Sequence, residues 1–592
     1  MNNILFILID CFDYTKIGNN ENRLSPTPFI DSLKEKGCWV ESMFSQAPYT
    51  EAALNATMCG HDTLDFGGYL KRYKNEPETL FEMAQRGGYE VYAQMWPHIH
   101  PTSALRGIDH LCLRPYSFNA LWCYRLVYYR DLFFKKELLN SDWLDIIELM
   151  DDNFTFWQSY YQMLINGDQQ VETIKSYSKL PNIHDDLKIL NKEINIYLQD
   201  KHSYIENLFI LGTSHQLFTL YSSELLTNKV HDRSIIEEAT NLFTYSIKRA
   251  HKMNRNLNLR NTKLSYNEMR ILWKQSQAPW KIWTRTPFSQ YLRNYYSLIM
   301  NQSLADQANG SYDMQKDSLS LKKWYDVFSE WYEKRNTDKP FFAYIHTEDI
   351  HGNPMLFDHC SSSISSLKQQ HTRLSAYLDK IPRNYKGNLA YDLGLLNIDY
   401  QLEQIFVRLN KSGLLKNTTI VITSDHGCGT NYNPLRGPIQ NFNEECYHVP
   451  YIMIGNNIKP GIDKELRLTK DILPTLAGYI GVSPEYHSTG KDILSQEGYE
   501  CIVQEYMGPG CPDMNRRKIW MCAFDRKWKV FVKIGLNTPF SQREICSIYN
   551  LKQDPNEINN LVFDNKSIAD AGYLLSKIEL RWNDIKRNHL NN

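Results

Sequence analysis

The run NILFILID, residues 3–10, decides the fold of this chain. Its apolar residues follow one another without alternation and end at Asp10. Such a run is typical of a strand buried on both faces of a parallel sheet. The segments PFFAYIHTED (340–349) and NTTIVITSDHG (417–427) repeat the pattern, each with ionisable side chains at its end. We therefore expect one sheet whose strands end in polar residues.

Helical patterns fall between these strands, in TPFIDSLKEKG (27–37), ETLFEMAQRGG (78–88) and LGLLNIDYQLEQIFVRLNKSG (393–413). Alternating strands and helices predict an α/β fold with a doubly wound mixed or parallel sheet flanked by helices. We assign residues 1–109 and 340–500 to this α/β domain. Residues 110–339 carry long helical patterns and many aromatic residues, which predicts a helical insertion that acts as a lid or selects substrate. The alternating segment 518–535 predicts a hairpin in a small C-terminal α+β domain, residues 501–592.

The composition excludes several classes of protein. The chain has 592 residues with 66 basic and 67 acidic side chains, so its charge gives no reason to expect nucleic acid as a partner. The 12 cysteines form no CxxC pair, which favours reduced thiols over a disulfide framework. No apolar run reaches the length of a membrane span. We expect a cytoplasmic protein without an integral membrane segment.

Three ionisable residues at predicted strand ends suit a metal ion. Asp10, Asp425 and His426 would meet at one sheet edge, because ligand sites of doubly wound folds lie at the carboxyl ends of the strands. Two carboxylates, an imidazole and the hydroxyl of Thr50 suit Mg²⁺, Mn²⁺, Ca²⁺ or Zn²⁺. Such an ion lowers the pKa of a bound hydroxyl and makes it a nucleophile. A strand-ending turn, with Asp425 as a cap and His426 in solvent, is the alternative.

Ordered motifs along the chain resemble the sulfatase branch of the alkaline phosphatase superfamily. They include LID (8–10), the loop around Thr50, RGID (106–109), PFFAYIHTEDIHGNP (340–354), VITSDHG (421–427), ECYHVPYIMIG (445–455), TKDILPTLAGYIGV (469–482) and IYNLKQDPNEINNL (548–561). The resemblance implies an alkaline-phosphatase-like fold and a hydrolase or transferase. It also implies that one or two divalent ions are bound.

Thr50 stands where this family places its nucleophile, ten residues before the glycine at Gly60. The alternative is that Thr50 is a helix N-cap, because a run of residues that favour helix begins at Glu51. True sulfatases carry Cys-x-Pro-x-Arg and convert the cysteine to formylglycine, whereas this chain has TEAAL, residues 50–54. We therefore expect no formylglycine. The resemblance is then to the phosphodiesterases and phosphoalcohol transferases of the superfamily, several of which use threonine.

Further site residues follow from the resemblance. They are, as proton donors or anion contacts, His351, His448 and Arg436; as substrate contacts, His98 and His346; and, as a second-metal ligand, Asp349. Each has an ordinary alternative as a polar residue at a strand end or in a solvated loop. One metal with histidine proton donors and two metals both remain open.

The function predicted from these residues is that of a metal-dependent phosphoester hydrolase, in particular a phosphodiesterase, or a phosphoalcohol transferase. It would act through a covalent phosphothreonine at Thr50. A strict sulfatase and an inactive family member that only binds are the alternatives. The expected partner is a phosphorylated small molecule, a glycan or a lipid headgroup, and formation of a homo-oligomer stays open.

Overall fold

The structure is a computed structural model, and it describes most of the chain. The described residues are 2–17, 24–67, 78–95, 106–113, 124–166, 183–219, 320–335, 337–351, 364–381, 389–428, 444–486, 488–506, 518–535, 538–555 and 557–589.

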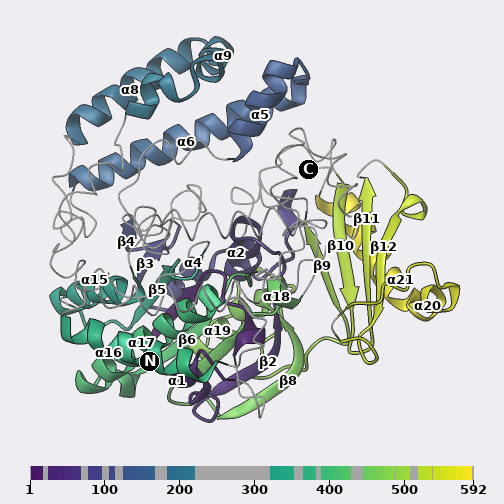
Figure 1. The fold of residues 1–592 in the computed structure, drawn as a ribbon. Coiled ribbons are helices and arrows are strands. Elements are labelled where there is room, and N and C mark those ends of the chain that lie inside the picture. The colour runs from purple at the N-terminus through teal and green to yellow at the C-terminus, as the bar shows by residue number, and fades with distance from the viewer. Residues whose placement is uncertain are drawn as a thin grey trace, which may run out of the picture.

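An eight-stranded sheet forms the centre of the molecule (Figure 1). Its strands in spatial order are β4 (His110–Leu113), β3 (Glu90–Met95), β5 (Phe341–Thr347), β1 (Asn3–Ile9), β6 (Thr418–Thr423), β7 (Tyr451–Ile454), β2 (Cys38–Phe44) and β8 (Gly461–Leu468). Strand β7 runs antiparallel to β6 and β2, and the other neighbouring pairs are parallel. All residues of β5 and β6 are buried, as a strand covered on both faces requires. The predicted mixed α/β sheet is confirmed.

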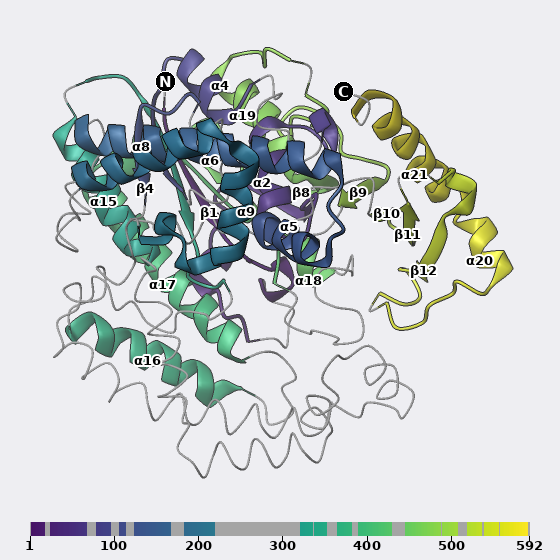
Figure 2. The same cartoon turned by 90° about the horizontal axis from the view of Figure 1, so that it is seen from above.

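Helices cover both faces of this sheet. On one face lie α2 (Thr50–Cys59), α4 (Leu80–Arg86) and α19 (Ile472–Ile480); on the other lie α1 (Pro28–Asp31), α15 (Leu321–Lys334) and α17 (Leu389–Lys411), with α16 (Ile364–Lys380) outside α17. Figure 2 shows α4 and α19 on the opposite side of the sheet from α16 and α17. Local sequence fixes the helix starts: Thr79 and Glu82 form a capping box at α4, and Ser320 caps α15.

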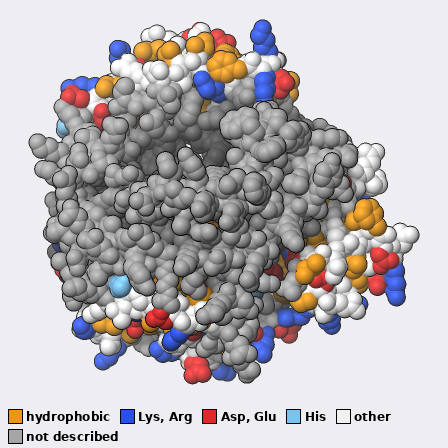
Figure 3. Space-filling model, in the orientation of Figure 1, with side chains coloured by type: hydrophobic (Ala, Val, Ile, Leu, Met, Phe, Trp, Pro, Cys, Tyr) orange, Lys and Arg blue, Asp and Glu red, His pale blue; other side chains and the backbone are white. Residues whose placement is uncertain are grey.

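Four helices from the aromatic-rich segment form a separate layer: α5 (Tyr124–Lys135), α6 (Asn140–Asn166), α8 (Ile183–Gln199) and α9 (Lys201–Leu211). They pack on one another, and buried side chains such as Trp157 and Tyr197 belong to the apolar cluster that continues into the sheet. Figure 3 shows apolar side chains gathered over this layer, where Ile196, Leu198, Ile210 and Leu211 are exposed. The helical character of this segment agrees with the sequence prediction.

The limits of the insertion and the three-part division of the chain stay predictions. Strand β4 falls within the expected insertion, yet it pairs with β3 in the large sheet. Helix α15 also falls within it, yet it packs on β5 and α17. Both elements therefore belong to the central layer structure.

A four-stranded antiparallel sheet forms the C-terminal part: β9 (Ile502–Tyr506), β10 (Lys518–Phe524), β11 (Trp528–Gly535) and β12 (Glu544–Asn550). One face carries α21 (Gly572–Asp584), and α20 (Asn565–Asp570) precedes that helix. The predicted hairpin is the β10–β11 pair.

Shorter helices complete the described chain: α18 (Glu444–Tyr447), η1 (Tyr14–Lys16), η2 (Asp65–Gly67), η5 (Gly212–Ser214), η6 (Gln216–Thr219), η8 (Leu414–Asn417), η9 (Thr469–Asp471), η11 (Phe540–Gln542) and η12 (Ile585–His589). Within the described ranges, no helix combines the length and the apolarity that crossing a membrane requires.

Candidate metal and catalytic centre

The centre forms where three neighbouring strands end. Strand β1 lies between β5 and β6 and runs parallel to both, so Leu8 is level with His346 on one side and with Thr423 on the other. Asp10 therefore follows β1 beside the end of β5 and beside Asp425 and His426, which follow β6. The structure brings Asp10, Asp425 and His426 together, with His346 beside Asp10.

Thr50 reaches this centre from the first turn of α2. Its hydroxyl donates to Asp10 Oδ2 over 3.4 Å and lies 3.2 Å from His426 Nε2. Tyr49, not Thr50, is the N-cap of α2, so the capping alternative does not describe the Thr50 hydroxyl. The helix N-terminus adds partial positive charge at this point, which favours an anion beside the hydroxyl.

Gly60 ends α2, at the spacing from Thr50 noted in the sequence. Its backbone is left-handed, with φ of 69°, and its N–H donates to the carbonyl of Ala56 over 2.9 Å. A Cβ at this position would lie 2.5 Å from Ser488 Oγ. Glycine is therefore required both by the backbone angle and by the close approach of the chain around Ser488.

The turn after β6 sets the direction of His426. Its Nδ1 lies 2.7 Å from the carbonyl oxygen of Gly427, and because a carbonyl only accepts, Nδ1 carries the hydrogen. The lone pair on Nε2 of the neutral ring then lies among acceptor atoms, with Asp10 Oδ1 and Asp425 Oδ2 each 3.5 Å away. Gly427 is needed for a different contact, since a Cβ there would lie 2.1 Å from the carbonyl oxygen of Glu445.

Ser424 is a part of the centre that the sequence analysis missed. Its hydroxyl accepts from the Phe12 amide over 2.9 Å and lies 2.6 Å from the carbonyl oxygens of both Ile9 and His426. This side chain therefore joins the segment after β1 to the segment after β6. A hydroxyl between an apolar strand and an Asp-His pair is the only signal that the sequence carries for it.

The charges of the centre influence one another strongly. Burial alone would raise the pKa of Asp10, but the imidazoles of His351, His346 and His426 outweigh it and hold that pKa well below its ordinary value. Burial, together with the charge of Asp10, raises the pKa of Asp425. Burial lowers the pKa of His426, yet the two carboxylates outweigh it and raise that pKa.

The same residues fit a divalent cation. Ligand atoms of Asp10, Asp425 and His426 all lie within 4.8 Å of one another, and we call these three residues the ion cluster. Asp10 Oδ1 and Asp425 Oδ2 are buried, and neither has a hydrogen-bond partner within the described part of the chain. Two buried carboxylate oxygens without donors are costly unless a cation meets them. With the Thr50 hydroxyl they make an oxygen-rich set with one imidazole, which suits Mg²⁺, Mn²⁺, Ca²⁺ or Zn²⁺.

His351 and His346 both lie beside Asp10, but in different surroundings. His351 is exposed, and its ring belongs with Asp10 and Cys11 to a second group of ligand atoms within 4.8 Å of one another. The His346 side chain is fully buried, with Nε2 3.7 Å from Asp10 Oδ2. His346 therefore stands beside the Asp10 carboxylate, and its contact with substrate stays a prediction.

Asp349 belongs to neither group of close ligand atoms found among the described residues. Its Oδ1 accepts from the amide of Leu321 over 3.0 Å and from the hydroxyl of Thr347. Its Oδ2 accepts from Gln401 Nε2 over 2.7 Å. Through these contacts the carboxylate joins the end of β5 to the first residue of α15 and to Gln401 within α17. They do not support the predicted role of Asp349 as a metal ligand.

His448 also has contacts of a structural kind. Its ring is stacked between Tyr14 and Phe44, with centroid distances of 4.2 and 4.7 Å. Its Nε2 lies 2.7 Å from the carbonyl oxygen of Glu41, and burial lowers the pKa of this imidazole to about 4. A neutral ring held in this way is a poor proton donor, so we leave His448 out of the proposed machinery. His98 and Arg436 lie outside the described residues.

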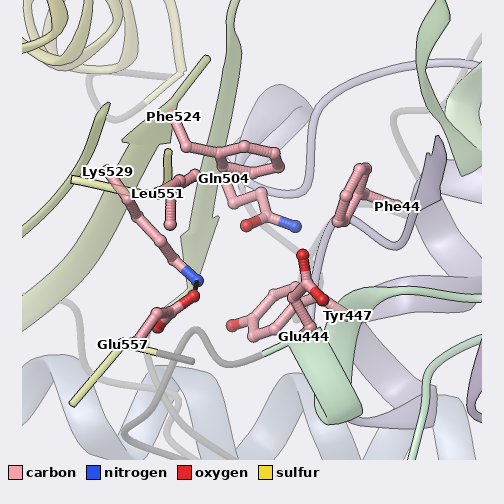
Figure 4. Close-up of a pocket in the computed structure, with 8 residues that line it drawn as sticks. All are labelled: Phe44, Glu444, Tyr447, Gln504, Phe524, Lys529, Leu551 and Glu557. Atoms are coloured by element: carbon pink, nitrogen blue, oxygen red, sulfur yellow. Dashed lines mark hydrogen bonds and ion pairs between the residues drawn. The ribbon is translucent and has the colours of Figure 1, made fainter. Parts of the chain in front are cut away.

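Figure 4 shows a small pocket between the C-terminal sheet and the large domain, lined by Phe44, Glu444, Tyr447, Gln504, Phe524, Lys529, Leu551 and Glu557. Lys529 Nζ and Glu557 Oε1 are paired at 2.7 Å. Burial lowers the pKa of Lys529, but Glu557 and other negative groups outweigh it and raise that pKa. None of the ion-cluster residues lines this pocket, which therefore reflects the contact between the two sheets.

Comparison with known proteins gives a family match. The family model described as Sulfatase matches residues 2–159 and 244–482. An endo-4-O-sulfatase of Bacteroides thetaiotaomicron is 22% identical over 284 residues, 42% of this chain and 54% of that protein. A choline-sulfatase of Rhizobium meliloti is 26% identical over 208 residues, 34% of this chain and 36% of that protein. The matched region thus spans about half and about a third of these curated relatives.

Among solved structures, the crystal structure of the phosphonate monoester hydrolase of Agrobacterium radiobacter aligns with a TM-score of 0.47 at 13% identity. That alignment covers 100% of this chain and 96% of the other.

Proposed function

Since this chain belongs to the sulfatase family, we propose that it is a metal-dependent phosphoester hydrolase or phosphoalcohol transferase whose nucleophile is the hydroxyl of Thr50. Enzymes of this superfamily bind a divalent metal. Here Asp10, Asp425, His426 and Thr50 would hold it, and it would supply charge stabilisation and a lowered hydroxyl pKa.

The position of the Thr50 hydroxyl carries the proposal. It stands at the first turn of a helix, 3.4 Å from one carboxylate oxygen and 3.2 Å from an imidazole nitrogen. An aliphatic hydroxyl is a weak nucleophile unless a base or a metal activates it. Asp10 and His426 provide acceptors for its proton at this place.

The residues around Thr50 favour phosphorus over sulfur as the reacting atom. Formylglycine releases sulfate by elimination from an aldehyde hydrate, but TEAAL offers no cysteine for that conversion. A threonine sulfate would have no such exit. A phosphothreonine can instead be cleaved by attack of water or an alcohol at phosphorus.

The proposed reaction has two displacements. Thr50 Oγ1 bonds to phosphorus, the bond from phosphorus to the leaving oxygen breaks, and that oxygen takes up a proton. His351 is the proposed donor, because its exposed ring lies beside Asp10. Water or a second alcohol then attacks phosphorus and loses its proton, the bond from phosphorus to Thr50 Oγ1 breaks, and Oγ1 takes up a proton. Arg436 and His98 stay predicted contacts of the substrate anion.

The proposed substrate is a phosphorylated small molecule, a glycan or a lipid headgroup. Sulfate ester hydrolysis is the second candidate, and the names of the two curated relatives favour it. A binding protein without turnover is the third.

Turnover measurements separate these candidates. Wild type, Thr50→Ala and Thr57→Ala are assayed with Mn²⁺ on aryl phosphodiesters, aryl phosphonates and aryl sulfates. Thr57 is the matched control, because it lies on the same helix and its hydroxyl donates to the carbonyl of Ala53. We expect hydrolysis of a phosphorus ester that falls at least about 10³-fold in Thr50→Ala and persists in Thr57→Ala. Full turnover by Thr50→Ala, or turnover of sulfates alone, would reject the proposal.

A further inference from the structure

The chain makes an unusual turn directly after β1. Cys11, next to Asp10, has a φ of 66°, in the left-handed region that non-glycine residues rarely occupy. An extended residue at this point would continue the chain in the direction of β1, whereas a left-handed residue bends it away. The left-handed conformation is unfavourable for a residue with a Cβ. It persists where other groups hold it, commonly at functional sites.

The hydroxyl of Tyr391 holds this turn. It donates to the carbonyl of Cys11 over 2.6 Å and accepts from the amide of Asp13 over 2.9 Å, so it joins the two sides of the turn. Tyr391 lies in α17 and is 1% exposed. Burial raises the pKa of Tyr391 well above its ordinary value, and the charge of Asp13 adds to this effect, so the hydroxyl keeps the proton that it donates. Hydrogen bonds in such a buried place are strengthened by the low local dielectric.

The turn also directs a backbone amide at the residues that follow β6. The Cys11 amide donates to Asp425 Oδ1 over 3.4 Å, and the same oxygen accepts from the His426 amide over 2.8 Å. Asp425 Oδ2 has no hydrogen-bond partner in the described part of the chain and is the oxygen left for a cation. The turn therefore places Asp10 through the covalent chain and helps to orient Asp425 through the amide of Cys11.

We propose that Tyr391 is a positioning residue of the ion cluster. Its hydroxyl keeps Cys11 in the left-handed conformation, and this turn keeps the carboxylates of Asp10 and Asp425 at the spacing that a divalent cation requires. Tyr391 acts through the backbone and not through a contact with the cation. The inference deepens the proposed function and rests on it for any effect on turnover, whereas the effect on the cation is tested by binding alone.

Calorimetric titration of the metal-free, full-length protein with Mn²⁺ tests the proposal. Tyr391→Phe removes the hydroxyl and keeps the ring. Groups that orient metal ligands commonly change the affinity by about 10–100-fold when removed, and we expect a loss of this size. Tyr400→Phe is the matched control, because this tyrosine lies on the same helix, is 6% exposed, and its hydroxyl donates to Gln369 Oε1 over 3.1 Å. It should bind Mn²⁺ as wild type does.

A second substitution shows whether the backbone at residue 11 is the cause. Glycine adopts the left-handed region without a penalty, whereas alanine retains the penalty. Cys11→Gly in the Tyr391→Phe protein should therefore recover about 5-fold or more of the lost affinity. Cys11→Ala in the same protein should recover none. If Tyr391 only stabilised its helix, the two substitutions would have the same effect on Mn²⁺ binding.

Cys11→Val, with Tyr391 in place, tests the turn if Tyr391→Phe does not fold. A β-branched residue is strongly disfavoured in the left-handed region. The Cys11→Val protein should therefore bind Mn²⁺ more weakly than the Cys11→Ala protein. Equal binding by these two variants would show that the cation does not depend on the turn.

Three further results would overturn the positioning role: unchanged Mn²⁺ affinity in Tyr391→Phe, an equal loss in Tyr400→Phe, or equal recovery by Cys11→Gly and Cys11→Ala. The two proposals fail separately. Turnover of a phosphorus ester by wild type, with unchanged Mn²⁺ affinity in Tyr391→Phe, rejects the positioning role alone. The expected Mn²⁺ affinities, with no turnover of any phosphorus ester by wild type, reject the proposed function alone.

Discussion

Ser424 connects the residues that follow β1 and β6. The Ser424→Ala variant keeps the strand but loses the contacts with Phe12, Ile9 and His426. Groups that orient metal ligands commonly change metal affinity by about 10–100-fold when removed. We expect a loss of this size in Mn²⁺ affinity by calorimetry. Thr423→Val is the control, because the Thr423 hydroxyl donates to the carbonyl of Pro450, and an equal loss there would contradict the assignment.

Some residues of the centre could be predicted from the sequence alone. Asp10, Asp425 and His426 were predictable because they lie within three residues of the end of a buried parallel strand, and such strand ends meet at one edge. Asp349 also follows such a strand, but its carboxylate turns to the amide of Leu321 and to Gln401. The side-chain direction after a strand depends on distant partners, which a local pattern does not contain.

The backbone of Cys11 could not be predicted from the sequence. A small cysteine after an apolar run is most often a buried hydrophobe, and the sequence analysis gave it no role. Its direction depends on a left-handed backbone that Tyr391 holds, and Tyr391 lies 380 positions away. A contact between such distant parts of the chain arises only when β1 and α17 are packed.

At the scale of elements, His448 ties the strand β2 region to η1. Its half-buried ring has a pKa lowered to about 4, below the value of about 6.5 in the unfolded chain. At pH values between these two pKa values, the imidazole is therefore protonated in the unfolded state and neutral in the folded state. Stability from this group is complete above pH of about 6.5 and is lost as the pH falls towards 4.

The variant His448→Gln tests this linkage, because an amide can still donate to the carbonyl of Glu41 but does not titrate. Between pH 7.5 and 4.5, wild type should lose on the order of 1–2 kcal/mol more stability than the variant. This is less than the full shift implies, since water still reaches part of the ring. Denaturant unfolding at several pH values measures it, and parallel pH profiles of the two proteins would contradict the assignment.

At the scale of the whole molecule, Arg581 joins the C-terminal part to the large domain. From α21 it reaches Glu505 on β9 at 2.6 Å and Asp65, in the turn after α2, at 2.7 Å. Both carboxylates are nearly inaccessible, at 2% and 3% exposed. Arg581→Met should lower the free energy of unfolding by about 3–5 kcal/mol, because it removes the guanidinium that contacts both buried carboxylates.

The exposed Arg587, which contacts only the carbonyl of Asn583 among the hydrogen bonds found in the described residues, supplies the control. Arg587→Met should change stability by less than about 0.5 kcal/mol. Denaturant unfolding followed by tryptophan fluorescence compares the three proteins. Equal stability of Arg581→Met and wild type would show that the ion pairs do not couple the two parts.

The order of strands in the large sheet could not be predicted from the sequence. The layers of the fold can be predicted from apolar runs and amphipathic helices, because both are local sequence patterns. The position of β7 between β6 and β2, antiparallel to both, depends on which edges pair after long connections. The centre was nevertheless predictable in outline, because β1, β5 and β6 carry its residues directly at their ends.

The proposed reaction requires that Thr50 becomes covalently phosphorylated, and mass spectrometry detects this modification. Protein with Mn²⁺ is mixed briefly with an aryl phosphodiester or an aryl phosphonate, quenched in acid and digested. We expect a phosphoryl-type adduct on Thr50 that is absent from Thr50→Ala and present in Thr57→Ala. Product release without any adduct on Thr50, or an adduct on another residue, would contradict it.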